Sequence, residues 1–136
     1  MGYEVKIKHL EFIQNIITRM NTNSFQLKSM SVAITSGLLA ITAAGDFEAL
    51  YPSIISLSLI VFWVLDAYYL SMEKAYRRLY DDVRQKNENM IDFNLSISDA
   101  HKRKCEWFYT LFNKTVYLFY ILQALISAIL VLLFQV

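Results

Sequence analysis

Two ionisable residues, Lys28 and Asp66, lie within otherwise apolar stretches of the chain and are its first candidates for chemistry. Lys28 stands at the start of the apolar stretch Leu27–Gly45, and Asp66 stands near the end of the stretch Ser53–Leu70. A charge inside a lipid bilayer is costly, so it generally faces the protein interior or water and pairs with an opposite charge. If the two stretches form an antiparallel hairpin, Lys28 and Asp66 lie at similar depth. We therefore predict an intramembrane ion pair between them; the alternative is a role in the passage of ions.

Basic residues gather in two other places, where they could contact a phosphate-bearing ligand or a lipid headgroup. These candidates for anion contact are Arg77, Arg78, Lys102, Arg103 and Lys104. The alternative is ordinary anchoring, because a Lys or Arg beside a membrane segment is attracted to anionic lipid by about 1 kcal/mol. The chain has three glycines, at positions 2, 37 and 45, and no glycine-rich phosphate loop accompanies the basic residues. Nucleotide binding in the usual loop-and-helix form is therefore not predicted.

The remaining reactive side chains form no catalytic pattern. His9 and His101 are far apart and lack companions at metal-ligand spacing, and the single Cys105 excludes an intrachain disulfide and a cysteine-rich metal site. We therefore predict no enzyme activity, no cofactor and no metal. The formal net charge of +1 gives no overall field that attracts nucleic acid, so we expect no direct nucleic-acid partner.

The distribution of positive charge predicts how the chain sits in a membrane. All thirteen Lys and Arg residues avoid the turn Asp46–Pro52 and the C-terminal run Thr115–Val136, and 56% of the residues are hydrophobic. Cytoplasmic flanks of membrane helices are enriched in Lys and Arg. We therefore predict an integral membrane protein with three transmembrane helices, a cytoplasmic N-terminus and an external C-terminus.

The chain divides into four segments of an all-α protein. Residues 1–23 form a cytoplasmic amphipathic helix, 24–70 a transmembrane hairpin, 71–104 a cytoplasmic helix extension with a loop, and 105–136 an interfacial helix followed by the third transmembrane helix. Several N-capping residues in Asn21–Ser24 predict a bend or a new helix start at this point. The uncharged stretch Val116–Val136 is long enough to cross about 30 Å of hydrocarbon.

Apolar residues at spacings of three and four predict a helical stalk on the cytoplasmic side. The stalk positions are Leu10, Ile13, Ile17 and Met20 in the first helix, and Met72, Tyr76, Leu79 and Val83 in the second, where Leu65 and Tyr69 extend the same spacing. Both helices leave the membrane on the same side and run antiparallel, so we predict that they pack together. The alternative is that each seam packs against the same helix of another subunit.

The first apolar stretch is crowded with small residues at helical spacing. Pairs of small residues four positions apart let helix backbones approach closely in lipid. The positions concerned are Ala33, Gly37, Ala40 and Ala44. They either pack within the hairpin, or they face another copy of the chain or line a pore, and the sequence leaves these alternatives open.

Several stretches of the chain resemble a group of small bacterial membrane proteins. They are RMNTNSFQLKSMSV, FWVLDAYYLSMEKAYRRLYDDV, IDFNLSIS and WFYTLFNKTVYLFY. The layout is similar to that of SLATT-type modules, which pair an amphipathic N-terminal helix with a membrane hairpin and a long cytoplasmic helix. The resemblance implies a role in bacterial defence against phage, as a membrane-disrupting or pore-forming effector under the control of a partner. This chain differs by its third crossing after Thr115 and by the lack of a fused sensor domain, so a separate partner is expected to supply the trigger.

These observations predict an oligomeric effector that permeabilises or depolarises the bacterial inner membrane when a cytoplasmic signal reaches the stalk. Its expected partners are membrane lipids, further copies of itself and a soluble component of the defence system. The alternative is a membrane anchor or scaffold that recruits a soluble partner through its cytoplasmic helices. A small ion or proton transporter ranks last, because it needs polar residues across the bilayer centre, where the third crossing offers only Gln123 and Ser127 and the second only Ser56 and Ser58.

Overall fold

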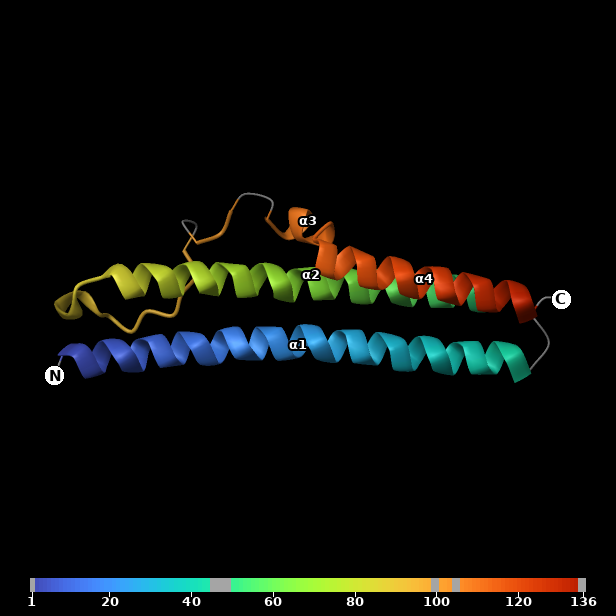
Figure 1. The fold of residues 1–136 in the computed structure, drawn as a ribbon, viewed down its shortest axis with the longest axis horizontal. Helices are drawn as coiled ribbons and strands as arrows, with labels where there is room; N and C mark the ends of the chain where they lie inside the picture. The colour runs from blue at the N-terminus through green and yellow to red at the C-terminus, as the bar shows by residue number, and fades with distance from the viewer. Residues whose placement is uncertain (1, 45–49, 99–100, 104–105, 135–136) are drawn as a thin grey trace.

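Long α-helices make up nearly all of this chain. The computed structural model describes residues 2–44, 50–98, 101–103 and 106–134, and these residues contain no β-strand. The helices are α1 (Gly2–Ala44), α2 (Leu50–Gln85), α3 (Glu106–Leu111) and α4 (Lys114–Phe134), with the short 3₁₀ helix η1 (Glu88–Met90) after α2. α1 and α2 run antiparallel, and α4 lies beside the half of this pair that is remote from the N-terminus (Figure 1). The predicted all-α fold is confirmed.

Three of these helices are long and apolar enough to cross a membrane: α1 over Tyr3–Ala44, α2 over Leu50–Gln85 and α4 over Lys114–Leu133. The second half of α1, the first half of α2 and the whole of α4 lie together at one end of the molecule (Figure 1). A single slab of hydrocarbon about 30 Å thick could therefore enclose all three apolar segments. The first part of α1 and the last part of α2 extend beyond them at the other end.

The helix α1 is continuous, so the predicted bend or helix start at Asn21–Ser24 is wrong. Its 43 residues extend for about 65 Å at 1.5 Å per residue. Side-chain hydroxyls that could have capped a new helix have other partners. Thr22 Oγ1 donates to the Thr18 carbonyl oxygen at 2.9 Å, and the Ser24 hydroxyl donates to the carboxylate of Asp66. A hydroxyl that bonds back to the preceding turn leaves the helical backbone intact.

The helix α2 closely matches the helix expected from Pro52 to Lys86. It begins at Leu50, so Pro52 lies in its first turn, where the missing backbone N–H breaks no helical hydrogen bond. It ends at Gln85, and the Lys86 N–H still donates to the Asp82 carbonyl oxygen at 3.2 Å. The Lys6 ammonium donates to the Lys86 carbonyl oxygen at 2.8 Å and so ties the start of α1 to the end of α2.

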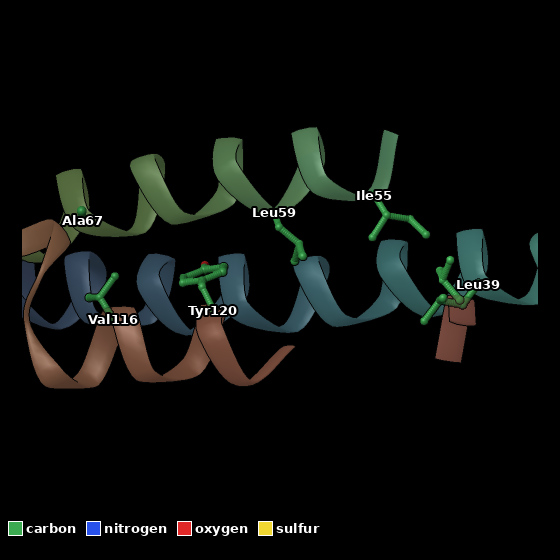
Figure 2. Close-up of a cluster of buried hydrophobic side chains, with 7 residues drawn as sticks. Leu39, Ile55, Leu59, Ala67, Val116 and Tyr120 are labelled. Atoms are coloured by element: carbon green, nitrogen blue, oxygen red, sulfur yellow. The ribbon is translucent and has the colours of Figure 1, made fainter. Parts of the chain in front are cut away.

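Buried apolar side chains form two clusters, one at each end of the molecule. The cluster in the apolar end consists of Leu39, Ile55, Leu59, Ala67, Val116, Tyr120 and Val131, contributed by α1, α2 and α4 (Figure 2). The cluster at the other end consists of Ile13, Ile17, Leu79 and Val83, with the partly buried Leu10, Tyr76, Tyr80, Ile91, Leu95 and Ile97 around it.

The predicted stalk seams of α1 and α2 therefore meet within one chain. Ile13 and Ile17 are buried in the same cluster as Leu79 and Val83, so these residues need no second subunit to cover them. Met20 on α1 and Met72 on α2 are half-buried. Leu65 does not belong to the seam: its side chain is 41% exposed, because the next two positions of α2 take the buried face.

The segment after η1 is an extended linker that lies across the stalk. Its alternate residues Ile91, Leu95 and Ile97 pack against the buried cluster of α1 and α2. The Asn94 backbone N–H donates to Asp92 Oδ1 at 3.2 Å, and this hydrogen bond lowers the pKa of the Asp92 carboxyl. Turn-forming residues correctly predicted a break in the helix here, but the packing of alternate apolar residues was not expected.

The short helix α3 connects the linker to α4. Trp63 of α2 donates its indole N–H to the Leu111 carbonyl oxygen at 3.0 Å, and its ring meets that of Phe112 edge to face. The side chain of Asn113 accepts the Thr115 N–H at 3.2 Å and so caps the start of α4. These contacts hold the beginning of α4 against α2.

Candidate functional site

The structure brings Lys28 and Asp66 together at the boundary between the apolar end and the stalk. Asp66 is fully buried on α2, and the Lys28 ammonium on α1 lies 2.5 Å from Asp66 Oδ2. The Ser24 hydroxyl donates to the other carboxylate oxygen, and Lys28 Nζ also lies 3.0 Å from Ser24 Oγ. One carboxylate thus accepts hydrogen bonds from two side chains of α1.

The burial of this pair determines what it contributes. Lys28 keeps 18% of its side chain exposed, whereas Asp66 has none. A buried carboxylate is tolerated where its charge is matched and its oxygens are hydrogen-bonded, and removal of one partner typically costs about 3–5 kcal/mol. The pair therefore holds α1 and α2 in one register. The ring of Phe119 on α4 covers it, with the Lys28 ammonium 6.0 Å from the ring centroid.

A second buried polar group links α1 to α4. The Ser31 hydroxyl donates to Gln123 Oε1 at 2.9 Å, and Gln123 Nε2 donates to Thr35 Oγ1 at 3.1 Å. Ser31 and Thr35 are both buried, and both face α4. One glutamine side chain therefore satisfies two hydroxyl groups on successive turns of α1.

These residues belong to a single polar face of α1. Its members are Ser24, Lys28, Ser31, Thr35 and Thr42, of which all but the half-buried Lys28 are buried. The face runs over 19 residues from Ser24 to Thr42, and its 18 steps of 1.5 Å make it about 27 Å long. Toward its far end the apolar Leu39 interrupts it, and the Thr42 hydroxyl bonds back to the Leu38 carbonyl oxygen at 2.8 Å. We call this set the α1 polar face.

Sequence reasoning found only the charged part of this face. The polar residues of α1 repeat at spacings of four, three and four from Ser24 to Thr35, which is the spacing of one helix face. This spacing can be read from the sequence, but the prediction for this helix used its small residues and not its polar ones. Uncharged polar residues are few in the apolar parts of α2 and α4, but α1 carries several of them, including Ser31, Thr35 and Thr42.

The small residues lie on the opposite side of α1. Ala33, Gly37, Ala40 and Ala44 are all exposed in the single chain, and a Cβ placed on Gly37 would have nothing within 4 Å. The alternative in which they pack within the hairpin is therefore wrong. Contact with another copy of the chain, or with a pore, is the alternative that stays open.

The basic residues do not gather into one anion site among the described residues. Arg78 forms a two-pronged ion pair with Glu106 at the start of α3, and its Nε–H donates to the His101 carbonyl oxygen at 2.6 Å. Arg77 pairs with Glu73 one turn back on α2 at 2.7 Å. Lys102 and Arg103 are exposed, and Lys104 lies outside the described residues.

A hydrogen-bonded row of Asp82, His101 and Ser98 attaches the linker to α2. His101 Nε2 lies 2.8 Å from Asp82 Oδ2, and His101 Nδ1 lies 2.7 Å from Ser98 Oγ. The Ser98 backbone N–H also donates to Nδ1, so this nitrogen is the acceptor and Nε2 carries the proton donated to Asp82. We interpret the row as structural, because it attaches the linker to α2.

Within the described residues no three His, Cys, Asp or Glu side chains lie close enough together to hold a metal ion. Comparisons of the chain with protein families, curated proteins and solved structures found no match. The geometry therefore defines only a class: an all-helical protein with three helices that are long and apolar enough to cross a membrane, and with a buried polar face between them.

Proposed function

We propose that this protein is an oligomeric effector of the bacterial inner membrane that permeabilises or depolarises the membrane when a cytoplasmic signal reaches its stalk, as part of a defence against phage. The observation that carries the proposal is the α1 polar face. Ser24, Lys28, Ser31 and Thr35 lie together on a helix apolar enough to cross a membrane. Polar and charged residues at such depth are costly and are typical of substrate or ion pathways. A plain anchor has no need of them.

The distribution of charge supports the proposed orientation. Lys6 and Lys8 lie at the start of α1, and Arg77, Arg78 and Arg84 lie in the last turns of α2, at the same end of the molecule (Figure 1). The opposite end, where α4 finishes, carries no Lys or Arg. The positive-inside rule then assigns the stalk to the cytoplasm and the C-terminus to the outside.

Self-association is supported by the exposed small residues of α1. A three-helix chain offers too few helices to surround an aqueous path by itself, so several copies are required. Ala33, Gly37, Ala40 and Ala44 give a smooth strip on which the backbone of a second α1 could approach closely. The strip and the α1 polar face lie on opposite sides of the helix, so a contact through the strip turns the α1 polar face of each copy away from that contact.

The proposal is tested by expressing the protein in bacteria that carry a potential-sensitive dye. We expect loss of membrane potential on strong expression or on phage infection, while cells that express the Asp66→Ala variant keep their potential. Unchanged potential under every one of these conditions would contradict the proposal.

A second function is favoured by exposed apolar residues on the stalk. Tyr3, Ile7 and Phe12 are more than one-third exposed near the start of α1, away from the apolar end of the molecule. Exposed apolar side chains at such a place are typical of a protein contact. In this alternative the protein is a membrane anchor or scaffold whose stalk recruits a soluble partner, and the membrane potential stays unchanged while the partner moves to the membrane.

A further inference from the structure

The helix α4 covers the middle of the α1 polar face, from Lys28 to Thr35. Phe119 lies over the Lys28 ammonium, and one turn further on Gln123 bonds to Ser31 and Thr35. No other described side chain is hydrogen-bonded to the side chains of Ser31 and Thr35. The polar part of the contact between α4 and α1 therefore consists of one aromatic cover and one glutamine, and Leu39 of α1 lies in one buried cluster with Tyr120 and Val131 of α4.

In lipid, the position of α4 against α1 depends mainly on these few polar contacts. Apolar helix faces gain little from packing on each other there, because lipid tails are as apolar as the side chains they replace, so hydrogen bonds and close packing hold the helices together. Close packing is incomplete around α4. A cavity of about 450 Å³ lies between α2 and α4, lined among others by Leu59, Trp63 and Ala128. A second cavity of about 250 Å³ lies between α1 and α4.

Withdrawal of α4 would change the solvent of the α1 polar face. Ser31 and Thr35 would lose their partner in a place where lipid supplies no hydrogen bond. Each hydroxyl would then either bond back to a carbonyl oxygen of the preceding turn, as Thr42 does, or bind water that enters as α4 leaves. The Lys28–Asp66 pair is held between α1 and α2, so it stays in place at the cytoplasmic end of the hydrated face.

We propose that α4 is the closing element of the permeation path: Gln123 seals the α1 polar face, and this face takes up water and passes small hydrated ions when α4 withdraws. The inference rests on the proposed function and adds to it the surface that lines the path and the residue that keeps it shut. In this proposal the observed arrangement is the closed one, because Phe119 and Gln123 of α4 contact the polar face at Lys28, Ser31 and Thr35.

The test uses the full chain in lipid vesicles with a single reporter thiol on the polar face. Cys105→Ser removes the native thiol, and Ser31→Cys places a nearly isosteric one on the buried face. Gln123→Leu then removes both hydrogen bonds to α1 while keeping the side chain's size. Leu125→Ala, a change on the exposed side of α4, is the matched control. Labelling by a charged thiol reagent that does not cross lipid, and release of entrapped potassium, are measured side by side.

We expect Gln123→Leu to raise both the labelling rate and the potassium release by about tenfold, the population change that the loss of two interhelical hydrogen bonds allows. The Leu125→Ala control should stay at the level of its parent. Potassium release without labelling would place the path elsewhere and overturn the inference, and so would a Gln123→Leu protein that neither labels nor leaks. Labelling in vesicles needs no cellular signal. A native protein that fails to depolarise cells would therefore contradict the effector role, but it would not contradict the role of α4.

Discussion

Asp66 is the residue that constrains the apolar part of this molecule most. A carboxylate with no exposed surface requires a matching charge and donors for its lone pairs, and Lys28 and Ser24 supply them from α1. Because both partners come from the other helix of the hairpin, the carboxylate fixes the register of α1 against α2. The pair thus fixes the architecture of the hairpin and also borders the proposed path.

The first prediction concerns this pair. Asp66→Ala should destabilise the protein by about 3–5 kcal/mol, because it leaves the Lys28 ammonium without its counter-charge in a largely buried place. The double variant with Lys28→Ala should recover part of the loss, since it removes the unmatched charge as well. Thermal unfolding in detergent, followed by circular dichroism, measures both variants, and equal stability of the single and the double variant would show that the two side chains are not coupled.

At the residue scale the sequence predicts charges well and uncharged polar contacts poorly. Lys28 and Asp66 could be paired from sequence because each is the one ionisable residue of an apolar stretch and a hairpin places them at similar depth. The bonds of Gln123 could not be predicted, because α4 is apolar on nearly all sides and its pattern does not show which side faces α1. Only packing fixes that rotation.

Among the elements, the linker between α2 and α3 is held by polar contacts as well as by the apolar packing of Ile91, Leu95 and Ile97. Arg78 holds it at two points, the His101 carbonyl oxygen and the carboxylate of Glu106. His101 adds a third through Asp82. The linker lies over the stalk cluster and leads directly to α3 and α4, so it is the mechanical connection between the stalk and the proposed closing element.

The second prediction tests this connection. Arg78→Gln should expose the linker and raise the rate of trypsin cleavage after Lys102 or Arg103 by about tenfold, because hydrogen bonds to a charged group are worth roughly 1.5–3 kcal/mol. Arg77→Gln is the matched control, since Arg77 pairs only with Glu73 within α2. Mass spectrometry of the fragments gives the site and the rate, and equal rates for the two variants would remove Arg78 from this role.

The long helices were predictable as elements, and their interruptions were less so. Apolar periodicity and Pro52 placed α2 within two residues of its observed limits at both ends. The sequence Asn21–Ser24 suggested a break in α1. A capping residue starts a new helix only where its side chain bonds to the backbone N–H groups of that helix. Here the hydroxyls of Ser24 and Thr22 bond instead to Asp66 and to the preceding turn. The linker's packing escaped prediction because extended segments have no backbone pattern that reveals their neighbours.

For the whole molecule, the proposed assembly needs a surface that joins one copy to another. The stalk seams are covered within one chain, and the α1 polar face is covered by α4. The strip of Ala33, Gly37, Ala40 and Ala44 is exposed and lies away from both. Assembly through this strip would place α4 of each copy on the side away from the contact, where it is free to move without breaking the oligomer.

The third prediction follows from the space around Gly37. Because nothing lies within 4 Å of a Cβ at this position, Gly37→Leu should leave the fold and the melting temperature of a single chain unchanged. In lipid the larger side chain should hold two α1 helices apart and shift the protein to a smaller assembly, whereas Gly37→Ala should keep most of the native size. Light scattering in detergent and crosslinking in vesicles measure the assembly.

Loss of the oligomer should also abolish depolarisation in cells, because one chain does not surround a path. Depolarisation by a Gly37→Leu protein that stays monomeric would show that a single copy suffices, and the small residues would then face lipid. An oligomer that persists in Gly37→Leu would instead place the contact on another surface, with the exposed side of α4 as the next one to test. The two results separate the role of the strip in assembly from the role of assembly in permeation.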